Sequence, residues 1–192
     1  MVPDGKGITN LLRIKYSKRV NRITGNELFE VLLNIANNES LKVAFIGASD
    51  SIQSKLANKV KLNFPYLSIV ASISPFFNFE SNPAENDKTI NELINKNPDI
   101  VFIALGSPRQ ELWISKIKER VGAKLYMGVG SVFDFYTGEK KRAPILFQQI
   151  GFEWFWRMLH EPKRLTKRYI CKDLSFFLKQ IKRIKLGQRK FK

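Results

Sequence analysis

Short apolar runs alternate with longer amphipathic stretches through the middle of the chain. The apolar runs occupy residues 42–47, 67–73, 99–105 and 123–127. Apolar residues recur at intervals typical of one helical face over residues 26–37, 51–64, 84–95 and 108–121. Continuously apolar strands separated by helices are typical of a parallel sheet that is covered on both faces. The pattern therefore predicts an α/β, Rossmann-like fold with a mostly parallel sheet and helices on both faces.

Basic residues are concentrated at the C-terminal end of the chain. Lys and Arg number 33 against 17 Asp and Glu, a formal net charge of +16. Residues 157–192 hold 13 of these bases and only two acids. Apolar residues recur among them at roughly helical spacing. We therefore predict an α/β domain at residues 1–150 and a basic, amphipathic helical appendage at residues 151–192.

The appendage and the remaining composition indicate where the protein works. An amphipathic helix with a basic face suits an anionic bilayer surface, and packing on the body of the protein or on another subunit is the alternative. Cys171 is the only cysteine, so no internal disulfide forms. No apolar run approaches the roughly 20 residues that cross a bilayer. We expect a cytoplasmic protein that lies peripherally on the inner face of the plasma membrane.

Glycine stands at the carboxyl ends of three of the four predicted strands. These glycines are Gly47, Gly106 and Gly128, and the remaining strand ends near Ser72. In open parallel sheets, ligands bind outside the carboxyl ends of the strands, and glycine lets a ligand approach the backbone closely. A single glycine there indicates an ordinary turn. Three together favour a site for a nucleotide or sugar phosphate, although neither a P-loop nor a G-x-G-x-x-G fingerprint is present.

Two predicted strand ends carry polar residues with alternative roles. Ser107, Pro108 and Gln110 fit a capping box at the start of a helix, and the Gln110 amide equally suits a sugar or nucleobase beside that helix end. Asp134 stands between two phenylalanines, so we expect a partly buried carboxylate that caps a turn or binds hydroxyl groups. The basic run at residues 140–142 faces either a diphosphate or solvent.

Together, these motifs resemble the WecG/TagA/CpsF family of bacterial glycosyltransferases. The resemblance runs in order through residues 3–5, 22–25, 106–113, 128–135, 138–144, 153–157 and 161–165. It implies an inverting, metal-independent transfer of an N-acetylmannosamine-type sugar from a UDP-sugar. The implied acceptor is a polyprenyl-diphosphate-linked sugar in cell-wall, teichoic acid or surface-polysaccharide synthesis. Self-association of the protein is also plausible from this resemblance.

The resemblance also implies roles for individual residues. Asp4 falls on the family's proposed catalytic base. With the strand-end residues, the expected donor site comprises Arg22, Gly47, Gly106, Gln110, Glu111, Gly128, Gly130, Asp134 and Arg142. The matches to a basic appendage that meets the acceptor diphosphate are Arg157, Arg164, Lys167 and Arg168.

The residues agree with the implied chemistry. Inversion needs one base to take the acceptor proton, and Asp4 can supply it. No Asp-x-Asp pair occurs in the sequence, so arginines such as Arg22 and Arg142 and helix N-termini would stabilise the departing diphosphate, with no cofactor or metal. A simple turn is the alternative interpretation of the Asp4-Gly5 pair.

Two departures from the family pattern leave other functions open. Asp4 is almost the first residue, where family members carry several dozen residues before this motif, and residues 72–77 replace a Gly-containing loop. One alternative is therefore a truncated, inactive relative. The other is a basic nucleic-acid-binding protein, although no nucleic-acid-binding motif is visible, so we expect no nucleic-acid partner.

Overall fold

The structure of the protein is a computed structural model that describes residues 9, 16, 21, 23–144, 146–147 and 153–160. The chain divides into two compact units. One unit is residues 25–141, and the other combines residues 1–24 with residues 142–192. The predicted division at residue 150 stays a prediction.

The unit at residues 25–141 alternates helices and strands along the sequence. In chain order its elements are α2 (Gly25–Asn38), β1 (Lys42–Gly47), α3 (Asp50–Asn63), β2 (Ser68–Ile73), the 3-10 helix η1 (Phe79–Ser81), α4 (Pro83–Lys96), β3 (Ile100–Ala104), α5 (Arg109–Val121), β4 (Leu125–Gly128) and α6 (Val132–Thr137). Within the described residues, the strands form one four-stranded sheet in the order β2-β1-β3-β4, and every pair is parallel. The predicted parallel sheet is confirmed.

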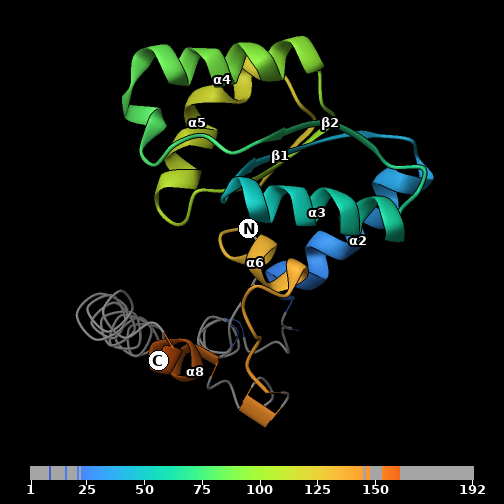
Figure 1. The fold of residues 1–192 in the computed structure, drawn as a ribbon, viewed down its shortest axis with the longest axis vertical. Coiled ribbons are helices and arrows are strands. Elements are labelled where there is room, and N and C mark those ends of the chain that lie inside the picture. Colours follow the sequence, from blue (N-terminus) through green and yellow to red (C-terminus); the bar gives the residue numbers. More distant parts are fainter. Residues whose placement is uncertain are drawn as a thin grey trace, which may run out of the picture. The chain divides into compact units, whose positions relative to one another are not determined.

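Helices cover both faces of this sheet. Figure 1 shows α4 and α5 on one face and α2, α3 and α6 on the other. The α/β, Rossmann-like class expected from the apolar pattern is therefore confirmed. Because successive side chains of a strand point to opposite faces, β1 sends Val43 and Phe45 to one core and Ala44 and Ile46 to the other.

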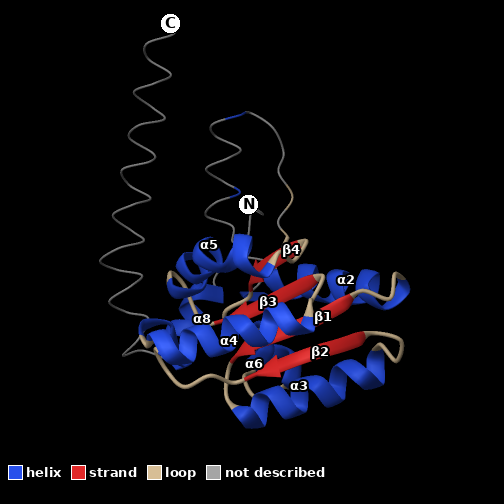
Figure 2. Ribbon diagram, turned by 90° about the horizontal axis from the view of Figure 1, so that it is seen from above, coloured by secondary structure: helices blue, strands red, loops and turns tan. Residues whose placement is uncertain are grey.

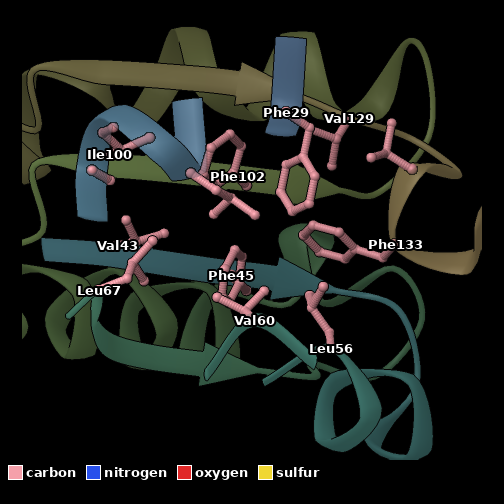
Figure 3. Close-up of a cluster of buried hydrophobic side chains, with 13 residues drawn as sticks. Phe29, Val43, Phe45, Leu56, Val60, Leu67, Ile100, Phe102, Val129 and Phe133 are labelled. Atoms are coloured by element: carbon pink, nitrogen blue, oxygen red, sulfur yellow. The ribbon is translucent and has the colours of Figure 1, made fainter. Parts of the chain in front are cut away.

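Aromatic rings fill the core between the sheet and the α2, α3 and α6 layer. Phe29 of α2 packs edge-on against Phe102 of β3 with ring centroids 4.8 Å apart. Phe133 of α6 meets Phe45 of β1 at 5.7 Å. Figure 3 shows these rings converging with Leu56 of α3. Each ring is fully buried, so the packing fixes α2 and α6 on this face.

The strand order places a topological switch point between β1 and β3. The chain leaves β1 through α3 on one face, whereas it leaves β3 through α5 on the other. Figure 2 shows the four arrows pointing the same way, so all the carboxyl ends lie along one edge. Ligands of open α/β sheets bind outside the carboxyl ends at such a switch point.

One carboxylate joins the opposite, amino edge of the sheet. Asp99, just before β3, accepts the Lys42 N–H of β1 at 2.8 Å and pairs with Lys124, just before β4, at 2.8 Å. The Asp99 backbone N–H donates to the Lys42 carbonyl, and the Asp99 carbonyl accepts the Leu125 N–H. The Lys124 ammonium, followed by the Lys42 N–H, lowers the pKa of this carboxyl. Asp99 thus fixes where three strands begin.

In the other unit, α8 spans Glu153–His160. The Phe147 and Trp156 rings lie 5.6 Å apart. This helix lies within the region predicted to be a helical appendage, and the appendage stays a prediction because residues 161–192 lie outside the described residues. In the part of the chain that the structure describes, helices long and apolar enough for a membrane span are absent.

Candidate functional site

The turn after β1 approaches the end of β3 so closely that only glycine fits. Gly47 has φ +97°, and a Cβ there would lie 2.7 Å from the Ala104 carbonyl oxygen. Gly47 and Ala104 are register partners across the switch point. Ala48 follows with φ 61°, and Ser49 then caps α3. The glycine expected at this strand end therefore has a packing reason as well as a place at the ligand edge.

A buried glutamine on α3 fastens the ends of β1 and β2. The Gln53 amide nitrogen donates to the carbonyl oxygen of Gly47 and, at 3.3 Å, to that of Ile73. Its oxygen accepts from the Ser72 hydroxyl at 2.7 Å. Ser74 adds a second link, because its hydroxyl donates to the Ala48 carbonyl at 2.7 Å. The turn after β1 is thus held from the β2 side.

A second buried glutamine fastens the turn after β4 to the start of α5. The Gln110 side-chain oxygen accepts the Gly130 N–H at 3.0 Å, and its nitrogen donates to Glu111 at 3.0 Å. A Cβ on Gly128 would lie 2.6 Å from that nitrogen, so the Gln110 side chain occupies the space that a side chain at residue 128 would need. The structure therefore brings together four predicted site residues, Gln110, Glu111, Gly128 and Gly130.

The capping box predicted at this helix is wrong. The N-cap residue is Pro108, which follows a cis Ser107–Pro108 peptide bond, and α5 begins at Arg109. Gln110 is then the second residue of the helix, and its side chain bonds to Gly130 and Glu111. The predicted end of β3 is also one residue too long, since Gly106 lies in the turn after Ala104.

Three side chains form a stack beside the start of α5. The Arg109 guanidinium pairs with both carboxylate oxygens of Glu80 in η1, through Nε and, at 2.7 Å, through Nη2. Its Cζ lies 4.5 Å from the centroid of the Phe77 ring. The hydrogen bond from Arg109 lowers the pKa of Glu80, and the same bond raises the pKa of Arg109. We call Phe77, Glu80 and Arg109 the Phe77 stack.

Asp134 lies in α6, a helix that the apolar pattern did not predict. Its side chain is 19% exposed and pairs with Lys140 at 3.5 Å, so the expectation of a partly buried carboxylate is confirmed. Lys140 therefore compensates Asp134. Lys140 is one of the three bases at residues 140–142, and it contacts a carboxylate of the protein while part of its side chain is exposed to solvent.

Polar contacts to α3 hold α6 in place. Lys59 donates to the Tyr136 carbonyl at 2.6 Å, and Asn63 donates to the Tyr136 hydroxyl at 3.0 Å. Lys55 pairs with Glu139 in the turn that follows. Burial raises the pKa of the Tyr136 hydroxyl. The segment that begins with Gly128 and leads to the basic run is thus fixed at several points.

Arg142 belongs to the other unit, where it meets a residue from the N-terminal part of the chain. Its Nη2 donates to the hydroxyl of Thr24 at 3.2 Å. Thr24 is buried and follows Arg22 by two positions in the sequence. Two predicted donor-site segments that are more than a hundred residues apart therefore meet at Arg142 and Thr24.

Several predicted site residues lie outside the described residues. They are Asp4, Arg22, Arg164, Lys167 and Arg168. Arg157 is described only as part of the α8 helix. Their roles stay predictions. Among the residues that the structure does describe, no three His, Cys, Asp or Glu side chains gather as a metal site requires, and the metal-independent reaction likewise stays a prediction.

The chain was compared with known protein families. The family model described as the glycosyl transferase WecG/TagA/CpsF family matches residues 1–190 of the 192. The chain belongs to this family. WecG/TagA/CpsF proteins are glycosyltransferases, so the carboxyl edge described above is part of a sugar-transferring enzyme.

Sequence reasoning missed three residues at this edge of the WecG/TagA/CpsF protein. The role of Gln53 was not predicted, because a single glutamine at a polar position of an amphipathic helix is usually exposed to solvent. Phe77 lies in a loop and Glu80 in the three-residue helix η1, which is too short to show a periodic apolar pattern. The one available signal was the departure of residues 72–77 from the family's Gly-containing loop.

Proposed function

We propose that this WecG/TagA/CpsF protein transfers an N-acetylmannosamine-type sugar from a UDP-sugar to a polyprenyl-diphosphate-linked sugar at a membrane surface. The reaction inverts the anomeric centre and uses no metal. It would serve cell-wall, teichoic acid or surface-polysaccharide synthesis. The observation that carries the proposal is the family match over residues 1–190, joined to a fixed carboxyl edge at a topological switch point.

The carboxyl edge has the features that a nucleotide-sugar needs. Gly47 and Gly130 both have positive φ, at +97° and +55°, a backbone conformation that residues with side chains rarely adopt. The start of α5 lies beside Gly130 through the bond that Gln110 accepts, and the positive end of the helix dipole favours an anion. Gln53 and Gln110 hold these turns before any substrate arrives, so little conformational entropy is lost when the donor binds.

Asp4 is the proposed base. One carboxylate can take the proton of the acceptor hydroxyl while that oxygen attacks the anomeric carbon from the face opposite UDP. The anomeric carbon–oxygen bond to UDP breaks in the same step, and the bonding electrons leave with the diphosphate. A single base therefore suffices for inversion, and a covalent intermediate is unnecessary.

Arginine side chains are the proposed stabilisers of the departing diphosphate. Negative charge grows on UDP as its bond to the sugar breaks, and a preorganised cation lowers the barrier. Arg142 and Arg22 are the candidates, and the contact between Arg142 and Thr24 supports a common location. Arg109 is unsuited to this task because Glu80 already compensates its charge. The appendage residues Arg157, Arg164, Lys167 and Arg168 would meet the acceptor diphosphate.

The test separates donor binding from transfer. Isothermal titration should show that the wild-type protein binds UDP and that Arg22→Ala binds it more weakly. Asp4→Asn should bind UDP with nearly unchanged affinity, yet lose transfer by about 10²- to 10⁴-fold, as expected when a general base is removed. Transfer is measured as UDP release from the UDP-sugar with a polyprenyl-diphosphate-linked acceptor.

A matched control is Asp87→Asn, the same change at an exposed carboxylate on α4 that pairs with Arg120. It should leave both UDP affinity and transfer unchanged. Turnover retained by Asp4→Asn would remove Asp4 as the base. A folded wild-type protein that does not bind UDP would contradict the donor assignment.

A further inference from the structure

The turn after β1 contains a residue with a strained backbone. Ala48 has φ 61°, in the left-handed region, and it directly follows Gly47 at φ +97°. A residue with a side chain adopts this conformation at a cost in free energy, because its Cβ crowds the following carbonyl oxygen. Such residues persist only where their surroundings hold them, and they cluster at ligand-binding sites. The conformation of Ala48 therefore points to a functional role for this turn.

Side chains from other elements hold the turn in this shape. The Gly47 carbonyl accepts a hydrogen bond from the buried Gln53 amide, and the Ala48 carbonyl accepts one from the Ser74 hydroxyl at 2.7 Å. The Ala48 methyl group packs against the core beneath α2, α3 and α6. On the other side, a Cβ on Gly47 would lie 2.7 Å from the Ala104 carbonyl oxygen, so β3 limits movement in that direction.

The segment that carries Ser74 is itself anchored. Phe79 is fully buried and packs edge-on against Trp113 of α5 with ring centroids 5.3 Å apart. The Phe77 stack ties the same segment to the start of α5. Because this segment cannot readily follow the turn, the Ser74 hydroxyl holds the Ala48 carbonyl from a fixed support.

The clamped turn lies where a sheet of this kind binds its ligand. Gly47 ends β1, and its register partner Ala104 ends β3. These two strands flank the topological switch point, and open α/β sheets bind ligands outside the carboxyl ends there. A ligand in that position contacts the backbone of residues 47–49.

We propose that Gln53 and Ser74 are positioning residues of the donor site, which hold the strained turn at residues 47–49 in the shape that the UDP-sugar contacts. Each acts through the backbone carbonyl that it bonds and does not itself touch the donor. The inference rests on the proposed function, which supplies the donor. It adds the strain at Ala48 as the reason that these two hydrogen bonds govern donor affinity.

The strain explains why the clamp affects binding. Without the bond from Ser74, Ala48 can relax towards negative φ, which is the lower-energy region for a residue with a Cβ. The donor then binds only the fraction of molecules that keep the competent turn, so its apparent affinity falls by that fraction. Glycine has no comparable preference, and a turn with glycine at residue 48 would depend less on the clamp.

Titration of Ser74 variants with UDP tests the inference. Ser74→Ala should weaken UDP binding about 5- to 10-fold, which corresponds to one lost hydrogen bond. Ser74→Thr keeps the hydroxyl and should bind within about threefold of wild type. In the transfer assay, Ser74→Ala should raise the KM for the UDP-sugar and leave both kcat and the KM for the lipid-linked acceptor nearly unchanged, because the turn contacts the donor throughout the reaction.

Ala48→Gly separates positioning from a general weakening of the fold. This substitution removes the strain, so adding Ser74→Ala to it should weaken UDP binding less than about twofold. A merely structural role for Ser74 would weaken binding equally with and without Ala48→Gly. Equal losses in the two backgrounds would therefore overturn the inference.

Gln53→Met tests the other half of the clamp. It keeps an unbranched side chain of similar length but removes the amide that bonds the Gly47 carbonyl. Its loss of UDP affinity should be at least as large as that of Ser74→Ala, measured on protein that circular dichroism shows to be folded. The Ser74 variants carry the same test if Gln53→Met does not fold.

Ser54→Ala is the matched control, because it removes a hydroxyl from the helix of Gln53 that bonds the Asp50 carbonyl within the same helix. It should leave UDP affinity and the KM for the UDP-sugar unchanged. If Ser54→Ala weakens binding as much as Ser74→Ala, the specific assignment is wrong. Wild-type UDP affinity in Ser74→Ala would also overturn it while leaving the proposed function intact. A folded wild-type protein without UDP affinity would overturn both proposals.

Discussion

At the scale of single residues, two buried amides organise the ligand edge. Gln53 connects the ends of β1 and β2, and Gln110 connects the start of α5 with the turn after β4. Each is nearly inaccessible to solvent, at 4% and 6% exposure. A buried amide that lost its partners would remain desolvated, so these bonds are worth more than surface ones. Gln110 therefore fixes the turn after β4 at the ligand edge.

Gly128 is the residue-scale test of this arrangement. In Gly128→Ala the new methyl group would lie 2.6 Å from the Gln110 amide nitrogen, so the side chain must move and its bond to Gly130 is lost. We expect a loss of about 1–3 kcal/mol in the free energy of unfolding, measured by urea denaturation. UDP affinity should fall with it.

Gly25→Ala is the control for the Gly128 substitution. Its methyl group would lie 3.5 Å from Val132, an ordinary contact, so the free energy of unfolding should change by less than about 1 kcal/mol. Equal effects of the two substitutions would show that the Gln110 amide does not depend on Gly128.

At the scale of elements, short polar links decide where strands begin and where helices are directed. Asp99 joins the starts of β1, β3 and β4, and side chains of α3 hold α6. The long helices and strands were predicted within one or two residues, because their apolar periodicity is extended. The helix α6 was missed since it spans only Val132–Thr137, too few residues for a period to repeat.

The lowered pKa of Asp99 leads to a prediction of how the free energy of unfolding changes with pH. Its folded-state pKa is lowered, so its carboxylate contributes stability above the unfolded value of about 3.9, and this contribution disappears as the pH falls through the folded value. Asp99→Asn should therefore be less stable than wild type at pH 7. The difference between the two proteins should shrink towards pH 3 in urea denaturation.

Asp87→Asn is the comparison for Asp99→Asn, because it removes an exposed pair with Arg120 whose side chains are 55% and 48% exposed. Exposed pairs contribute about 0–1 kcal/mol, so its denaturation curves should follow those of wild type. A constant difference between Asp99→Asn and wild type across the pH range would refute the role assigned to the carboxylate.

At the scale of the whole molecule, the positive charge is concentrated at the C-terminal end of the chain. Residues 157–192 hold 13 of the 33 bases. In the proposed function this excess attracts the protein to anionic lipid, and each base near such a surface contributes about 1 kcal/mol. The attraction should weaken with salt, since mobile ions screen it.

Truncation after Glu161 tests the membrane contact. The truncated protein should no longer sediment with phosphatidylglycerol vesicles, whereas the full chain should do so at low salt. A full-length variant with Arg164, Lys167 and Arg168 changed to Gln should bind the vesicles less tightly without loss of chain. Unchanged sedimentation of both proteins would refute the membrane role.

The sequence by itself determined the parallel α/β architecture, the order of its elements and the family. The reason is that apolar periodicity is a local property, and family motifs are read directly from residues in order. Only the tertiary structure decided that Gln110 is directed to Gly130, that Gln53 joins two strand ends and that Arg109 supports Phe77. These partners come from different elements, and nothing local to a side chain says which neighbours the folded sheet will bring to it.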